Sequence, residues 1–179
     1  MRPVSLLLIA LLALAACAPT APLPDASPTI FFLVRHAEKQ SGSDPGLTAQ
    51  GQARANALAD VLVHAGVDRI ISSQFRRTRD TAAPLAERLG MEVEARNLDL
   101  NDAAGSSAAI ALELAASSPG QTILMVGHSN TISHIASALT GIPMDDLDER
   151  DYDNLFIVVR EGDSGEFIRT RFGATDPVP

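Results

Sequence analysis

The chain of 179 residues has one cysteine, Cys17, no internal repeat, and fewer basic than acidic residues. If Cys17 is lipidated, as the segment around it suggests below, no thiol remains for a disulfide. The net charge of −8 argues against a nucleic-acid partner, because such proteins neutralise phosphates with basic patches. A small anionic ligand is not excluded, since a few cations gathered in one pocket set its local potential.

No apolar run is long enough to cross a bilayer: the longest, residues 4–16, follows Arg2 and fits the apolar part of a signal peptide. It ends in Leu-Ala-Ala-Cys17, which resembles the lipobox of bacterial lipoproteins. The resemblance implies a signal peptide at 1–16, cleavage before Cys17, and diacylation of its thiol, which gives stable membrane anchoring. Because Ala18 follows, we expect the outer membrane, facing the periplasm. The alternative is a plain secretory signal cut near Ala16 or Ala18.

Residues 17–28 carry four prolines and no apolar periodicity, so we interpret them as the lipid-attachment cysteine and an extended tether. We expect one domain over 29–179. Strand-like and helix-like segments alternate there, which predicts a three-layer α/β/α fold with a mainly parallel sheet and an antiparallel edge hairpin. The predicted strands are 29–34, 68–72, 91–95, 121–128, 154–160 and 166–172, and the predicted helices are 47–65, 73–90, 103–117 and 129–141.

Some local features of the helices are also predicted. Thr48 is expected to cap the helix over 47–65, whose apolar face includes Val61. Ser72 or Ser73 is expected near the cap of the helix over 73–90. Pro84 should kink that helix or divide it into two pieces.

Cationic and polar side chains follow three of the predicted strands. They are Arg35 and His36 after the first, Ser72, Ser73, Arg76, Arg77 and Arg79 after the second, and Gly127, His128, Ser129 and Asn130 after the fourth. Ligands of parallel α/β sheets bind beyond the carboxyl ends of the strands, and helix N-termini there favour anions. Since arginine binds oxyanions bidentately and keeps its charge, this edge of the sheet is predicted to bind a phosphoryl group.

Three segments carry a resemblance to a known family: "VRHAEK", "SSQFRRTRDTA" and "VGHSN", in this order. They are similar to the motifs of the histidine phosphatase superfamily, which includes the phosphoglycerate mutases. The resemblance implies that His36 is the nucleophile and forms a phosphohistidine that water hydrolyses. It implies that Arg35 and Arg77 clamp the phosphate, that His128 holds the transferring oxygens, and that neither a metal nor another cofactor takes part.

The chain departs from the family pattern at the general acid. Many members supply a carboxylate after the second helix, where the candidates here are Asp99 and Asp102; Glu38, beside the nucleophile, is a third, and no motif marks any of them as the acid. Ser129 and Asn130 are expected to cap a helix rather than to bind phosphate. The chain also lacks the long insertion of the mutases. It resembles the short phosphohistidine phosphatases, which implies a small phosphorylated substrate or a phosphoprotein with a good leaving group.

Two other interpretations remain open at this point. One is a non-catalytic lipoprotein that binds a phosphorylated ligand on the same fold. The other treats His36 and His128 as metal ligands; it lacks an obvious third ligand, and nearby arginines would repel a divalent cation. The sequence does not indicate an oligomeric state.

Overall fold

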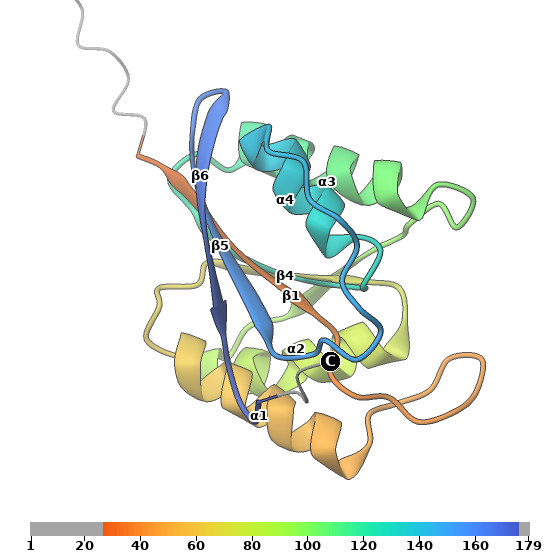
Figure 1. Ribbon diagram of the computed structural model, residues 1–179. Coiled ribbons are helices and arrows are strands. Elements are labelled where there is room, and N and C mark those ends of the chain that lie inside the picture. The colour runs from red at the N-terminus through yellow and green to blue at the C-terminus, as the bar shows by residue number, and fades with distance from the viewer. Residues whose placement is uncertain (1–26, 176–179) are drawn as a thin grey trace, which may run out of the picture.

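The structure, a computed structural model, describes residues 27–175, in which one six-stranded sheet lies between two layers of helices (Figure 1). Its elements are β1 (Thr29–Arg35), α1 (Ala49–Leu62), β2 (Arg69–Ser73), α2 (Arg76–Leu89), β3 (Val93–Arg96), α3 (Ala103–Ser117), β4 (Thr122–Gly127), α4 (Ile132–Thr140), β5 (Asn154–Glu161) and β6 (Ser164–Arg171). Helices α1 and α2 cover one face of the sheet, and α3 and α4 cover the other. The predicted three-layer fold is confirmed.

The order of the strands brings three of their carboxyl ends together. The sheet runs β3-β2-β4-β1-β5-β6, and its first four strands are parallel. Strand β5 pairs antiparallel with β1, and β6 returns along β5, so the predicted edge hairpin is confirmed as well. The central strands β2, β4 and β1 therefore end next to one another at one edge of the sheet.

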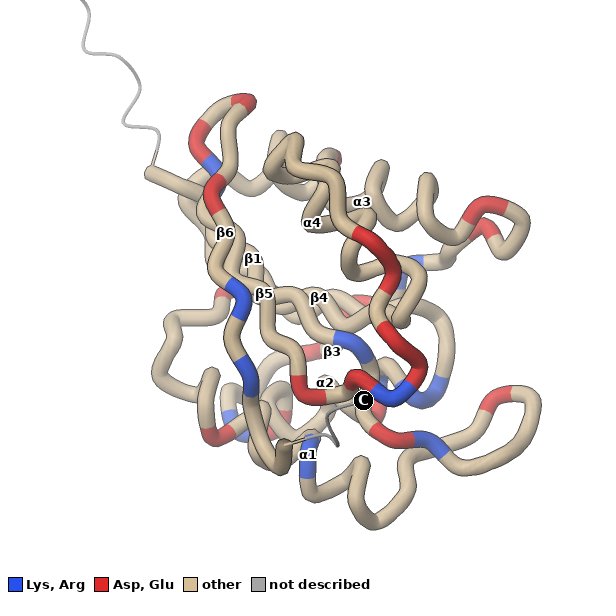
Figure 2. The backbone as a smooth tube through the Cα atoms, in the orientation of Figure 1, with Lys and Arg blue, Asp and Glu red and all other residues tan. Residues whose placement is uncertain are grey.

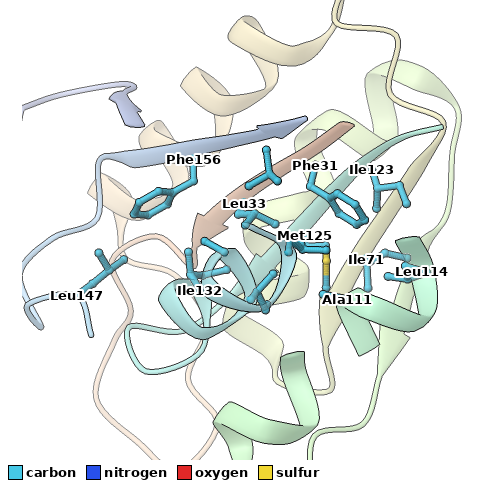
Figure 3. Packing of buried hydrophobic residues seen from close by; sticks show 14 residues of the cluster. Phe31, Leu33, Ile71, Ala111, Leu114, Ile123, Met125, Ile132, Leu147 and Phe156 are labelled. Atoms are coloured by element: carbon cyan, nitrogen blue, oxygen red, sulfur yellow. The ribbon is translucent and has the colours of Figure 1, made fainter. Parts of the chain in front are cut away.

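The central strands are apolar on both faces because each face is covered by helices. In β1, Phe31 and Leu33 pack into a cluster with α3 and α4, as Figure 3 shows, while Val34 belongs to the cluster beneath α1 and α2. All three side chains are fully buried. Since burying each such side chain contributes roughly 1.5–3 kcal/mol, the strand that leads to Arg35 is firmly fixed.

The helix over 103–117 was predicted with the bounds that α3 has, but two details of the first helix differ. Thr48 caps α1 as expected, and its side chain accepts a hydrogen bond from the amide of Gly51. The helix ends at Leu62 rather than near residue 65. Val61 is 52% exposed, so the expected apolar face is rotated from the buried one, which contains Arg54.

One prediction for the second helix is wrong, and one of the two alternatives for Pro84 does not occur. Helix α2 begins at Arg76 and its N-cap, Phe75, makes no side-chain cap, because Ser72 and Ser73 are the last residues of β2. Pro84 was predicted either to kink the helix or to divide it, and the division does not occur, since α2 is continuous through it. Leu85 of α2 is buried against the sheet. This packing outweighs the cost of the backbone hydrogen bond that is lost at proline.

The predicted signal peptide, Cys17 and nearly all of the predicted tether lie outside the described residues. Within residues 27–175, no helix is long and apolar enough to span a bilayer.

Candidate active site

Four predicted site residues meet at the carboxyl edge of the sheet. Arg35 is the last residue of β1 and His36 follows it; His128 follows β4, and Arg77 lies in the first turn of α2. The ring centroids of His36 and His128 are 5.4 Å apart. Arg35, His36 and His128 are 1%, 3% and 8% exposed, so the cluster is set into the protein rather than on its surface.

The tautomer of His36 follows from its hydrogen bond. Its Nδ1 lies 2.8 Å from the carbonyl oxygen of Ala37, and since a carbonyl only accepts, Nδ1 carries the proton. Burial, with the charges of Arg35 and Arg77 adding to it, lowers the pKa of His36 from 6.5 to about 3, although the bond to Ala37 opposes this shift. At neutral pH the ring is therefore uncharged, and its Nε2 carries a free electron pair.

The backbone around His36 is held from two sides. The amide of Ala37 donates to the Thr81 hydroxyl, 2.9 Å away, and that hydroxyl donates to the carbonyl of Arg77. On the other side, α1 passes so close that a Cβ on Gly51 would lie 2.1 Å from the carbonyl oxygen of Glu38. Glycine at 51 therefore permits this contact. Both contacts fix the direction in which the imidazole points.

His128 is held in the opposite tautomer. Arg77 Nη2 donates to its Nδ1 at 3.3 Å, and its Nε2–H donates to the Ser73 hydroxyl at 2.9 Å. The chain continues from Ser73 to the Thr78 hydroxyl and ends on the carbonyl of Phe75. Burial, followed by the charge of Arg77, lowers the pKa of His128 to about 3, so this ring is also neutral.

Arg35 is buried beneath the segment that joins α4 to β5. Its Nη1 donates to the carbonyl of Asp148 at 2.9 Å and its Nη2 to the Glu149 carboxylate at 2.8 Å. Its guanidinium carbon lies 4.2 Å from the centroid of the Tyr152 ring, within the range of a cation–π contact. Tyr152 in turn lies beside His36, with ring centroids 6.2 Å apart. Residues 148–152 of this segment thus form one wall of the site.

The guanidinium carbon of Arg77 lies 4.3 Å from the centroid of the Phe75 ring. Its Nη1 is 3.9 Å from a carboxylate oxygen of Asp44. Burial lowers the pKa of Arg77, which the charge of Asp44 opposes, and a guanidinium keeps its charge in either case. The neighbouring Arg76 points elsewhere and pairs with Asp80 at 3.3 Å.

The prediction that Ser129 and Asn130 cap a helix is wrong. The N-cap of α4 is Thr131, without a side-chain cap, and its hydroxyl accepts instead from the amide of His128. The Ser129 hydroxyl donates to Glu149 at 2.5 Å, and Asn130 is exposed. The Ser129 hydroxyl binds the carboxylate rather than a backbone amide, because a hydrogen bond to a charged acceptor is stronger than one between neutral groups.

The three carboxylates expected as possible acids have other partners. Glu38 forms a bidentate pair with the buried Arg54, with distances of 2.8–3.0 Å. Asp99 accepts from the amide of Asn101, and Asp102 caps α3. Each of them thus has a structural role in the described part of the chain, and the structure does not bring them together with the two histidines.

Sequence reasoning missed Glu149 and Tyr152, both in the acidic segment at residues 145–153, and the buried Arg54. The sequence shows that this segment is rich in carboxylates, but it does not indicate which of them contacts Arg35. Across residues 27–175, no three His, Cys, Asp or Glu side chains are grouped so that they could hold a metal ion.

Comparison with known proteins agrees with this geometry. A family model described as "Histidine phosphatase superfamily (branch 1)" matches residues 31–103 and 99–175. A probable phosphoglycerate mutase, GpmB of Serratia proteamaculans, is 39% identical over 70 residues, which are 35% of this chain and 33% of that protein. The PE-PGRS family protein PE_PGRS11 of Mycobacterium tuberculosis is 54% identical over 48 residues, 26% of this chain and 8% of that one. The chain thus spans a third or less of these relatives.

Solved structures share the fold at low identity. A mycobacterial glucosyl-3-phosphoglycerate phosphatase complexed with VO3 has a TM-score of 0.64 at 20% identity, covering 82% of this chain and 99% of that one. A putative α-ribazole-5'-phosphate phosphatase of Escherichia coli has a TM-score of 0.66 at 16% identity, covering 81% and 97%. Because the family model covers nearly all of the described residues and the motif side chains meet in one site, the chain belongs to branch 1 of the histidine phosphatase superfamily.

Proposed function

We propose that the protein is a phosphatase in which His36 takes the phosphoryl group from the substrate and passes it to water. The observation that carries this proposal is the state of His36: a buried, neutral ring with Nδ1–H bound to Ala37 and a free Nε2. Such a nitrogen is a nucleophile, whereas a protonated one is not. Family membership and the fold shared with phosphatases support the same conclusion.

The reaction has two steps on this site. The Nε2 electron pair forms a bond to phosphorus, and the bond from phosphorus to the leaving group breaks with its electrons. Arg35 and Arg77 stabilise charge on the equatorial oxygens. An arriving dianion would raise the pKa of His128 and turn its Nδ1 into a donor. Water then attacks the phosphohistidine, which releases phosphate and restores His36.

The carboxylates predicted as acids are engaged elsewhere, so the site favours substrates whose leaving group needs little help. Phosphoramidates, including phosphohistidine, and anhydrides have such leaving groups, and the substrate is a small phosphorylated compound or a phosphoprotein.

A quenched-flow experiment tests the proposal on residues 25–179 with an activated aryl phosphate and EDTA. We expect turnover, and we expect quenching with alkaline detergent in the steady state to yield a phosphoenzyme that is acid-labile and base-stable and maps to His36. Phosphate-dependent thermal stabilisation without turnover would instead support the non-catalytic binder. Turnover that stops on chelation would support a metal site.

We also propose that the chain is a lipoprotein anchored through Cys17, because Leu-Ala-Ala-Cys17 follows a short apolar run. With the full chain expressed in a Gram-negative host, we expect radioactive palmitate to label the wild type in the outer-membrane fraction and not Cys17→Ser. Equal membrane association and processing of the two proteins would show that the proposal is wrong.

A further inference from the structure

Each of the two clamp arginines already holds a carboxylate, and the two carboxylates come from different loops. Glu149 accepts from Arg35 Nη2 at 2.8 Å and from the Ser129 hydroxyl at 2.5 Å. On the other side, Asp44 lies 3.9 Å from Arg77 Nη1. Each of these two positive charges therefore has an anion beside it, and Figure 2 shows in red the acidic stretch between α4 and β5 to which Glu149 belongs.

The two arginines are more buried than the carboxylates beside them, and Asp44 is also held at the start of α2, where it accepts from the amide of Arg76 at 2.9 Å. The side chain of Arg35 is 1% exposed and that of its partner Glu149 is 78% exposed. Likewise the side chain of Arg77 is 16% exposed and that of Asp44 is 47% exposed. An incoming phosphoryl group can therefore bind the guanidinium groups while the exposed Glu149 carboxylate turns toward solvent and Asp44 stays bound to the amide of Arg76.

The arginines also have donors that no carboxylate uses. The buried Nε of Arg35 and that of Arg77 have no hydrogen-bond partner among residues 27–175. A buried donor without a partner is costly, which points to a ligand that completes the site. A tetrahedral oxyanion offers more acceptor oxygens than a carboxylate and suits the fork of an arginine.

Glu149 is an anion in this position rather than an acid. The hydrogen bond from Ser129, with the charge of Arg35, holds the pKa of the Glu149 carboxyl below its usual value, although partial burial opposes this. A group that is ionised at neutral pH has no proton to give to a leaving group. When a substrate is bound, Glu149 therefore contributes a negative charge beside it.

These observations bear on the substrate. When phosphate is bound to the arginines, the nearby charges of Glu149 and Asp44 repel an anionic organic group and attract a cationic one at short range. We propose that this pair of carboxylates selects phosphorylated substrates that carry a positively charged nitrogen close to the phosphoryl group. The proposal rests on the phosphate site of the proposed function and adds the class of substrate.

Binding to the His36→Ala variant tests this without turnover. Calorimetry at pH 8 compares phosphoethanolamine with propyl phosphate, which has a methyl group in place of the ammonium. We expect phosphoethanolamine to bind about fivefold more tightly, as one near-surface charge interaction of about 1 kcal/mol gives. Adding Glu149→Gln and Asp44→Asn should bring the ratio of the two Kd values close to one.

Asp163→Asn is the matched control, because it removes one acidic charge at the β5–β6 turn, where β5 ends beside the first residue of β1. This is the opposite edge of the sheet from the site, so the ratio should not change. If Glu149→Gln tightens both ligands equally, the carboxylate only competes with phosphate and the proposal is overturned. If His36→Ala binds phosphoethanolamine more tightly than propyl phosphate but the wild type shows no turnover, the phosphatase proposal is rejected and the substrate-class proposal stands.

Discussion

His36→Ala is expected to lower kcat for an activated aryl phosphate by on the order of 10⁴-fold or more, because it removes the nucleophile of the proposed two-step reaction. Binding of phosphate should largely persist, since the donors of Arg35 and Arg77 remain. The measurement is steady-state turnover together with the melting temperature of each variant, which reveals whether the fold survives.

His64→Ala is the matched control, since His64 is exposed just after α1 and has no place in the site. Its turnover should equal that of the wild type. If His36→Ala keeps wild-type turnover while it remains folded, then the assignment of His36 as nucleophile is wrong.

The pH profile of the wild type provides a second readout for His36. The neutral ring is the reactive form, so kcat/KM falls only as pH approaches the pKa of the free enzyme, which lies at about 3. After correction for the ionisation of the substrate, kcat/KM should change by less than about threefold from pH 8 to pH 5. A histidine with its ordinary pKa of about 6.5 would lose roughly 30-fold at pH 5.

Much of the site could be predicted because its side chains stand at strand ends. A continuous apolar run predicts a buried strand, and parallel strands place their carboxyl ends at one edge, so Arg35, His36 and His128 follow from position alone. The choice of Arg77 among three arginines required the family motif. Its physical basis appears only in the structure, where Arg77 contacts His128 while Arg76 points outward to Asp80.

Contacts across the chain could not be predicted in the same way. Glu149 reaches Arg35 because the backbone of the preceding residue, Asp148, is held by the same guanidinium, a contact between residues 113 positions apart. The burial of Arg54 was not predicted, because an alanine-rich helix has no clear apolar face from which its buried side could be read. The side of α1 that is buried depends instead on the partners of Arg54 elsewhere in the chain. These partners are Glu38 and the carbonyls of Phe172 and Ala174.

Replacing either clamp arginine by lysine is expected to lower kcat by about 10²–10³-fold, the range for the loss of one preorganised donor to a developing anion. Lysine keeps the positive charge of Arg35 or Arg77 but loses the planar fork that binds two oxygens at once. Because the fork matters most when charge spreads over the equatorial oxygens, kcat should fall more than KM rises. Steady-state kinetics separate the two parameters.

Arg76→Lys and Arg79→Lys are the controls, since both arginines are exposed on α2 beside Arg77. Each should retain turnover within about twofold of the wild type, since surface substitutions away from the site have small effects. If Arg76→Lys lowers kcat as much as Arg77→Lys does, then the positive charge of α2 as a whole contributes, rather than the contacts of Arg77 with the phosphate. A specific loss at Arg77 would tie catalysis to the side chain that the β2–α2 turn directs at His128.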